Sequence, residues 1–156
     1  MSVGTTDQAK ALIQSWMNNR GIYKDDTIST KNVTFQLNGV NSNGIGFSVI
    51  QPIGLKTSVI IIAQIDLHPA HYKALAELSK PTRNKFLFRL KRDLVFRPPA
   101  FMFNDPEIPK SIQFSNEIMF EELSESKIRE VIENAIKCVL WVAWSFGEEF
   151  GLPEGT

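Results

Sequence analysis

The stretch that decides the fold of this chain is residues 128–150, which read IREVIENAIKCVLWVAWSFGEEF. In its first half, apolar residues recur at the spacing of one helix face, with charged residues between them. From Cys138 to Phe146 the stretch is apolar on nearly every side, and a helix of that kind must be covered all round. It falls well short of the roughly 20 apolar residues that a membrane span needs. We therefore predict a core helix, capped by Ser124, that lies on a sheet with another element on its back.

Length and composition are those of an ordinary globular protein. The chain has 156 residues, 43% hydrophobic and 22% charged, so we expect residues 1–156 to form a single domain with a real core. No apolar run follows a basic N-terminus, which makes the cytoplasm the expected location. The single cysteine excludes an internal disulfide and fits a reducing compartment. No cofactor and no metal site are expected.

The formal charges are distributed unequally along the chain although they sum to zero. Residues 1–104 carry 13 Lys and Arg against 6 Asp and Glu, whereas residues 105–156 carry 4 against 11. Opposite halves of one domain most simply neutralise each other, within a chain or between two copies. An unpaired polybasic surface is the less economical interpretation.

The first half of the chain predicts a helix followed by three strands. Helical spacing of apolar residues, Leu12 and Trp16 among them, predicts a first helix from a cap at Thr6 or Asp7 to Gly21.

Alternating apolar residues predict a hairpin of strands over 33–37 and 45–49. Tyr23 and Ile28 offer the start of an edge strand before it. The continuous run in Ser58–Leu67 predicts a central strand buried on both faces.

The second half predicts helices, two short strands and the closing helix. Helices are expected over 70–78 and, after Pro81, to about Phe96; strands are expected over 100–104 and 112–120. The order α-β-β-β-α(α)-β-β-α places the chain in the α+β class, with an antiparallel sheet of about five strands and helices on one side.

That order of elements resembles the type III secretion chaperone-like fold. Roughly residues 59–146 are more closely similar to an uncharacterised archaeal family of that fold, a domain of unknown function. The likeness rests on residues 84–94 (NKFLFRLKRDL), 118–129 (IMFEELSESKIR) and 139–144 (VLWVAW). The resemblance implies that the chain binds other polypeptides and forms a homodimer. It implies no catalytic residue, and a step from fold to function is an analogy.

One cluster deserves consideration as an enzyme or metal site. Asp66, His68 and His71 lie close together between the central strand and the next helix. A metal site needs further protein ligands in reach, and only carboxylates are available. We favour a structural turn here and keep an unrecognised enzyme site as an alternative. Cys138 lies in the most apolar part of the final helix, where a cysteine acts as a small hydrophobe.

The basic segment 80–97 is the second candidate, with Lys85, Arg89 and Arg92 on one outer helix stripe. A nucleic-acid or anion-binding protein would use such a face, and that function stays as an alternative. The neutral net charge argues against a strong phosphate-binding surface. We favour pairing with acidic residues of the last helix, Glu130 and Glu133, or with a protein partner.

The third candidate is an apolar interface. Interfaces favour aromatic side chains, and a large uncovered apolar patch is unusual on a monomer. The candidate residues for contact with a partner are Trp141, Trp144, Phe146, Leu12 and Trp16. Packing within the core alone explains the apolar half of the final helix equally well, and that alternative stays open. The leading hypothesis is therefore a non-enzymatic, cytoplasmic domain that binds protein and forms a homodimer, without nucleic acid or membrane as partner.

Overall fold

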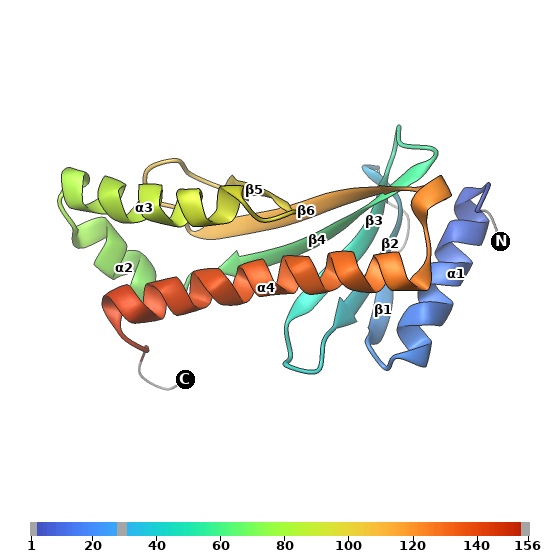
Figure 1. Cartoon of the computed structure of the whole chain (residues 1–156), viewed down its shortest axis with the longest axis horizontal. Coiled ribbons are helices and arrows are strands. Elements are labelled where there is room, and N and C mark those ends of the chain that lie inside the picture. Colours follow the sequence, from blue (N-terminus) through green and yellow to red (C-terminus); the bar gives the residue numbers. More distant parts are fainter. Residues whose placement is uncertain (1–2, 28–30, 154–156) are drawn as a thin grey trace.

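One twisted antiparallel sheet carries the fold (Figure 1). The structure, a computed structural model, describes residues 3–27 and 31–153, and within them the sheet has six strands in the order β1-β2-β3-β4-β6-β5. The strands are β1 (Tyr23–Thr27), β2 (Val33–Val40), β3 (Gly46–Pro52), β4 (Ser58–Asp66), β5 (Ala100–Phe103) and β6 (Ser111–Met119). The helices are α1 (Thr6–Asn19), α2 (Pro69–Glu77), α3 (Lys80–Val95) and α4 (Glu125–Phe150), with a 3-10 turn over Phe120–Glu122.

The predicted α+β class, antiparallel sheet and final helix are confirmed. The Ser124 hydroxyl accepts a hydrogen bond from the Lys127 N–H at 3.0 Å, which caps α4 as expected. The helix ends at Gly151, whose φ of 81° only glycine adopts readily. The predicted cap of α1 is wrong by one residue, because the Thr5 hydroxyl, not that of Thr6, accepts the first-turn N–H.

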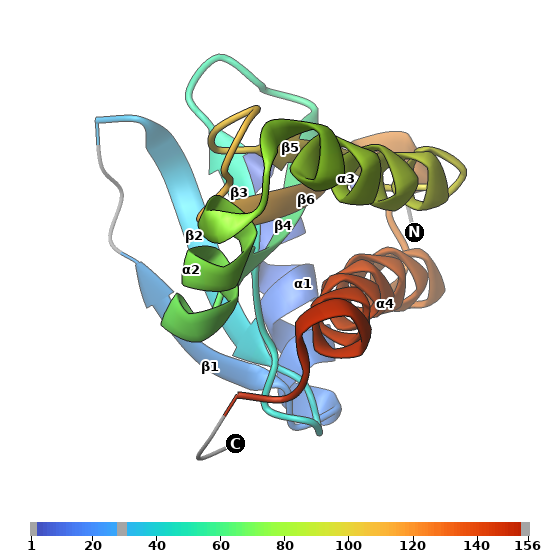
Figure 2. The same ribbon diagram turned by 90° about the vertical axis from the view of Figure 1, so that its left-hand side faces the viewer.

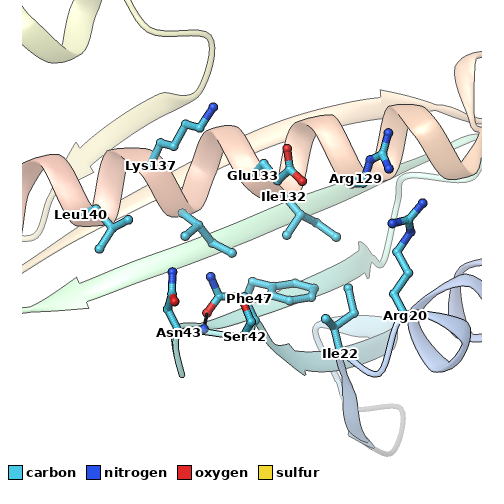
Figure 3. Close-up of a pocket in the computed structure, with 12 residues that line it drawn as sticks. Arg20, Ile22, Ser42, Asn43, Phe47, Arg129, Ile132, Glu133, Lys137 and Leu140 are labelled. Carbon is cyan, nitrogen blue, oxygen red and sulfur yellow. Dashed lines mark hydrogen bonds between the residues drawn. The ribbon is translucent and has the colours of Figure 1, made fainter.

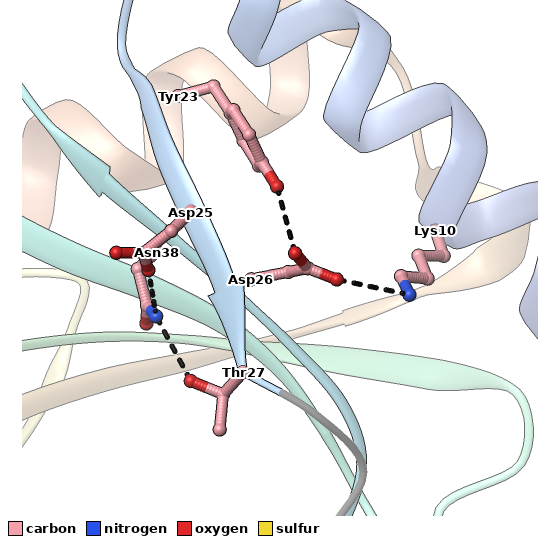
Figure 4. A network of polar contacts seen from close by, with 6 residues as sticks. All are labelled: Lys10, Tyr23, Asp25, Asp26, Thr27 and Asn38. Carbon is pink, nitrogen blue, oxygen red and sulfur yellow. Dashed lines mark hydrogen bonds and ion pairs between the residues drawn. The ribbon is translucent and has the colours of Figure 1, made fainter.

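The sixth strand is β1, the edge strand offered at Tyr23; its other residues are polar and mostly exposed and give no hydrophobic pattern. Backbone pairing with β2 and several side-chain contacts hold it to its neighbours (Figure 4). The Asn38 amide donates to the carboxylate of Asp25 at 2.7 Å and to the hydroxyl of Thr27 at 3.1 Å. Asp26 pairs with Lys10 of α1 at 3.6 Å. Ile28, the other residue of the expected edge strand, lies outside the described residues.

The expectation that β4 is buried on both faces is wrong for one of them. β4 is central, and Val59 and Ile61 are fully buried under the helices. Figure 2 shows α1, α3 and α4 on the same side of the sheet. The alternate residues Ile60 and Ile62 face the other side and are only half-buried. An uninterrupted β-branched run therefore identified the central position of the strand but not the number of covering layers.

Helix α4 crosses β4 and β6 and forms the middle of the helix layer (Figure 1). Its amino-terminal part lies near α1, and its carboxyl-terminal part packs against α2 and α3. Arg97, just beyond α3, lies over the ring of Trp141, while Arg89 reaches Glu149. Helices α3 and α4 therefore run antiparallel to each other.

Candidate binding surfaces

The cluster of Asp66, His68 and His71 serves the local structure. His68 caps α2, with Nδ1 accepting a backbone N–H at 3.1 Å. His71 is buried, and its Nε2–H donates to the Gly151 carbonyl at 2.8 Å, which joins α2 to the end of α4. The Asp66 carboxylate accepts from Gln64. Within residues 3–27 and 31–153, no group of three or more His, Cys, Asp or Glu side chains could hold a metal ion.

Cys138 is buried in α4. Burial raises the pKa of its thiol, and the nearby Arg97 opposes that shift only in part. Since the thiolate is the reactive form, both burial and the raised pKa make the residue a poor nucleophile.

We expect Cys138 to react with a disulfide reagent at pH 8 on the order of 100-fold more slowly in the native protein than in concentrated guanidinium. The absorbance of the released thiolate measures both rates. Rapid labelling of the folded protein would show that the thiol is accessible and would contradict this assignment.

The basic stripe of Lys85, Arg89 and Arg92 is exposed on α3, as its spacing predicts. With Thr82, Phe86 and Glu149 these residues line a cavity of about 310 Å³ between α3 and the end of α4. The prediction that this stripe pairs with Glu130 and Glu133 is wrong. Arg89 instead pairs with Glu149 at 3.1 Å, because the antiparallel arrangement brings the carboxyl-terminal end of α4 to this part of α3.

The five residues predicted for a partner interface have different environments. Phe146 is fully buried against Phe86, with ring centroids 5.0 Å apart. Trp141 is partly buried, and Leu12 and Trp16 pack against the core. Trp144 is the exposed member, with 65% of its surface accessible. Helical spacing places Trp141, Trp144 and Phe146 on different sides of α4, and only the structure shows which side lacks a cover.

A second apolar surface, which the sequence analysis missed, lies on α3 and the edge strand β5. We define the α3–β5 surface by three side chains of α3 and its carboxyl-terminal end that are 62–89% exposed: Phe88, Val95 and Phe96. Met102 is 63% exposed but lies on the opposite face of the sheet, because its neighbours Phe101 and Phe103 pack toward the helices. Lys91 connects the two elements, with its Nζ 5.9 Å from the Phe88 ring centroid and 5.0 Å from that of Phe103. The i, i+7 spacing of Phe88 and Val95, away from the buried stripe, was the signal available in the sequence.

A groove lies between α4 and the β2–β3 turn (Figure 3). Its volume is about 420 Å³. Its lining comes from three separate parts of the chain: Arg20, Ile22, Asn41, Ser42, Asn43, Phe47, Arg129, Ile132, Glu133, Ile136, Lys137 and Leu140. Figure 3 shows Ile132 and Leu140 pointing from α4 toward the side of Phe47 and the turn.

None of the helices in the described part of the chain is both long and apolar enough to cross a membrane.

Comparisons with known proteins confirm the fold resemblance. The family described as "Uncharacterized conserved protein (DUF2299)" matches residues 9–146. No curated protein matches the chain. The crystal structure of an uncharacterized protein from Methanothermobacter thermautotrophicus is 24% identical, with a TM-score of 0.86 over 92% of this chain and 99% of that one. The HopA1–SchA chaperone–effector complex contains a chain that is 10% identical, with a TM-score of 0.53 over 85% of this chain and 90% of that one.

Proposed function

The chain belongs to the DUF2299 family of uncharacterized conserved proteins, and we propose that it is a non-enzymatic, polypeptide-binding domain that forms a homodimer. The α3–β5 surface is the observation that carries the proposal. The fold likeness to a chain of a chaperone–effector complex agrees with it as an analogy.

Exposed apolar side chains gather on this surface. It holds three of the eight large apolar side chains that are exposed among the described residues: Phe88, Val95 and Phe96. Single apolar side chains on a surface are ordinary, but a group of them with two aromatic members is typical of interface cores. Phe96 is 89% exposed, so a partner would remove a large apolar area from water.

A second copy of the chain is the partner we propose for this surface. Among the described strands, β5 ends the sheet and pairs with β6 alone, so its outer edge offers backbone groups to a further strand. A twofold axis beside β5 would bring the same surface of two copies together and cover both sets of apolar side chains.

Light scattering coupled to size-exclusion chromatography tests the homodimer. Between about 5 and 100 µM we expect twice the mass of one chain, and about one chain mass for the double variant Phe88→Asp and Phe96→Ser, because a charge at the centre of an apolar interface costs several kcal/mol. Ile53→Ser is the matched control, since Ile53 is 58% exposed but lies in the β3–β4 turn. A wild-type mass of one chain at every concentration would remove the homodimer from the proposal.

We also propose a cytoplasmic location and a single domain. The buried, unpaired Cys138 is suited to a reducing compartment. All the described helices pack against one continuous sheet or against helices that do, which supports one domain.

Anion or nucleic-acid binding by α3 is the weaker candidate. Lys85 and Arg92 line the 310 Å³ cavity without an ion-pair partner in the described residues, which favours an anion there. However, Arg89 is already paired with Glu149, and the Glu107 carboxylate lies 3.8 Å from Lys80 Nζ. Carboxylates at both places would repel a phosphate backbone.

A further inference from the structure

The groove between α4 and the β2–β3 turn has an apolar floor. Phe47 lines the groove from β3, and Ile132 and Leu140 point toward it from α4 (Figure 3). Ile136 of α4 is also part of the lining. These residues of α4 are spaced at i, i+4 and i+8, so they form one continuous row along the helix. Phe47, Ile132 and Ile136 are 4–6% exposed, whereas Leu140 is only partly buried, so Leu140 is the main apolar contact that the floor offers to a guest.

The rim on α4 is mainly cationic. Arg129 and Lys137 are exposed, and no acidic side chain of the described residues pairs with either. They are eight residues apart, which is about 12 Å along a helix. Glu133 lies between them on the same rim, and Arg20 at the end of the groove pairs with Glu125 at 3.2 Å. The long side chains of Arg129 and Lys137 are therefore available to carboxylates of a guest.

The opposite rim offers neutral polar groups. Asn41 is occupied by the turn itself, because its carboxamide oxygen accepts the backbone N–H groups of Asn43 and Ile45 at 3.0 and 2.8 Å. The side chains of Ser42 and Asn43 are exposed and make no hydrogen bond to the residues that the structure describes. A hydroxyl and a carboxamide can donate to, and accept from, the backbone of a peptide.

From the apolar floor, the cationic rim and the neutral polar rim we infer that the groove binds an acidic, amphipathic segment of another polypeptide. Apolar side chains of the guest would lie on Phe47 and Leu140, and two carboxylates would meet Arg129 and Lys137. In an extended segment, residues four apart are about 13 Å apart, which matches the separation of the two cations. This inference rests on the proposed polypeptide-binding function and adds the ligand chemistry and the place where it binds.

A selection from a random 12-residue peptide library, carried out on the immobilised full-length chain, tests the inference. Enriched peptides are expected to carry acidic residues about four positions apart with apolar residues between them. Lys137→Glu should weaken their binding about tenfold, and Leu140→Asp at least as much, measured by fluorescence anisotropy. Raised salt should weaken binding to the wild type.

The matched control is Lys85→Glu, which makes the same charge reversal on α3, outside the groove. We expect its peptide affinity to equal that of the wild type. Circular dichroism and thermal melting establish that each variant is folded before binding is compared.

The outcomes separate the two proposals. The groove inference would be overturned, and polypeptide binding would still stand, if the enriched peptides bound Lys137→Glu and Leu140→Asp with the same affinity as the wild type. A loss of affinity in Lys85→Glu alone would have the same meaning. A selection that enriches no peptide would overturn both. A change of molar mass caused by Leu140→Asp would show that the groove joins two copies, and this would also overturn the inference.

Discussion

Phe146→Ala is expected to lower the free energy of unfolding by about 3–5 kcal/mol, the usual cost of removing a fully buried phenylalanine ring. The ring is inaccessible to solvent and lies among Phe86, Phe150 and His71, with centroid separations of 5.0, 5.7 and 5.8 Å. These neighbours come from α2, α3 and α4, so a cavity there would loosen all three helices together. Equilibrium denaturation in urea measures the loss.

Trp144→Ala is the control on the same helix. Trp144 is two residues from Phe146 but points away from the core, so its replacement should change the free energy of unfolding by about 0.5 kcal/mol or less. Equal losses in the two variants would mean that Trp144 is covered in solution, and the assignment of the α4 faces would have to change.

Gly39→Ala is expected to destabilise the protein by about 1–3 kcal/mol, because a methyl group at this position has no room. The new Cβ would overlap the Phe47 ring and lie 2.7 Å from the backbone carbonyl oxygen of Ile22. The backbone of β2 at Gly39 is paired on both sides, with Tyr23 of β1 and Phe47 of β3, and therefore has little freedom to move. Thermal melting and urea denaturation measure the effect.

Gly46→Ala is the matched control, because Gly46 lies in the neighbouring strand β3 and the nearest atom to its new Cβ would be 3.8 Å away. There we expect no loss, and a gain of up to about 1 kcal/mol from the stiffer unfolded chain. If Gly39→Ala were as stable as the wild type, the close packing of Phe47 on Gly39 would be disproved. Since Phe47 lines the groove floor, Gly39→Ala should also weaken the binding of groove peptides.

The sequence alone supported those features that depend on local patterns. The apolar row of α4 and its cap at Ser124 could be predicted because they depend only on residues close together in the sequence. The β-branched run likewise placed β4 at the centre of the sheet. Only Tyr23 indicated β1, because the strand is held by backbone pairing with β2 and by hydrogen bonds from Asn38, eleven or more residues away, and its other residues form no apolar face. Such pairings depend on the tertiary arrangement and leave no periodic signal.

The binding surfaces were harder to predict for the same reason. Residue types identified Lys85, Arg89 and Arg92 as an outer stripe, but the partner of Arg89 depended on how α3 lies along α4. Trp141, Trp144 and Phe146 looked equivalent until the positions of the neighbouring helices were known. The groove joins side chains from α4, β3 and the β2–β3 turn, and no single stretch of sequence contains its pattern.

Helix α4 is continuous over 26 residues, and it forms one wall of the groove before it packs against α3. A guest that displaced α4 at the groove would therefore also displace its contacts with α3, where Arg89 pairs with Glu149 and Arg97, just beyond α3, lies over Trp141. Binding of a guest peptide in the groove and dimerisation through the α3–β5 surface would then be coupled, with one coupling free energy between the two events. By reciprocity, each event would change the affinity of the other by the same factor.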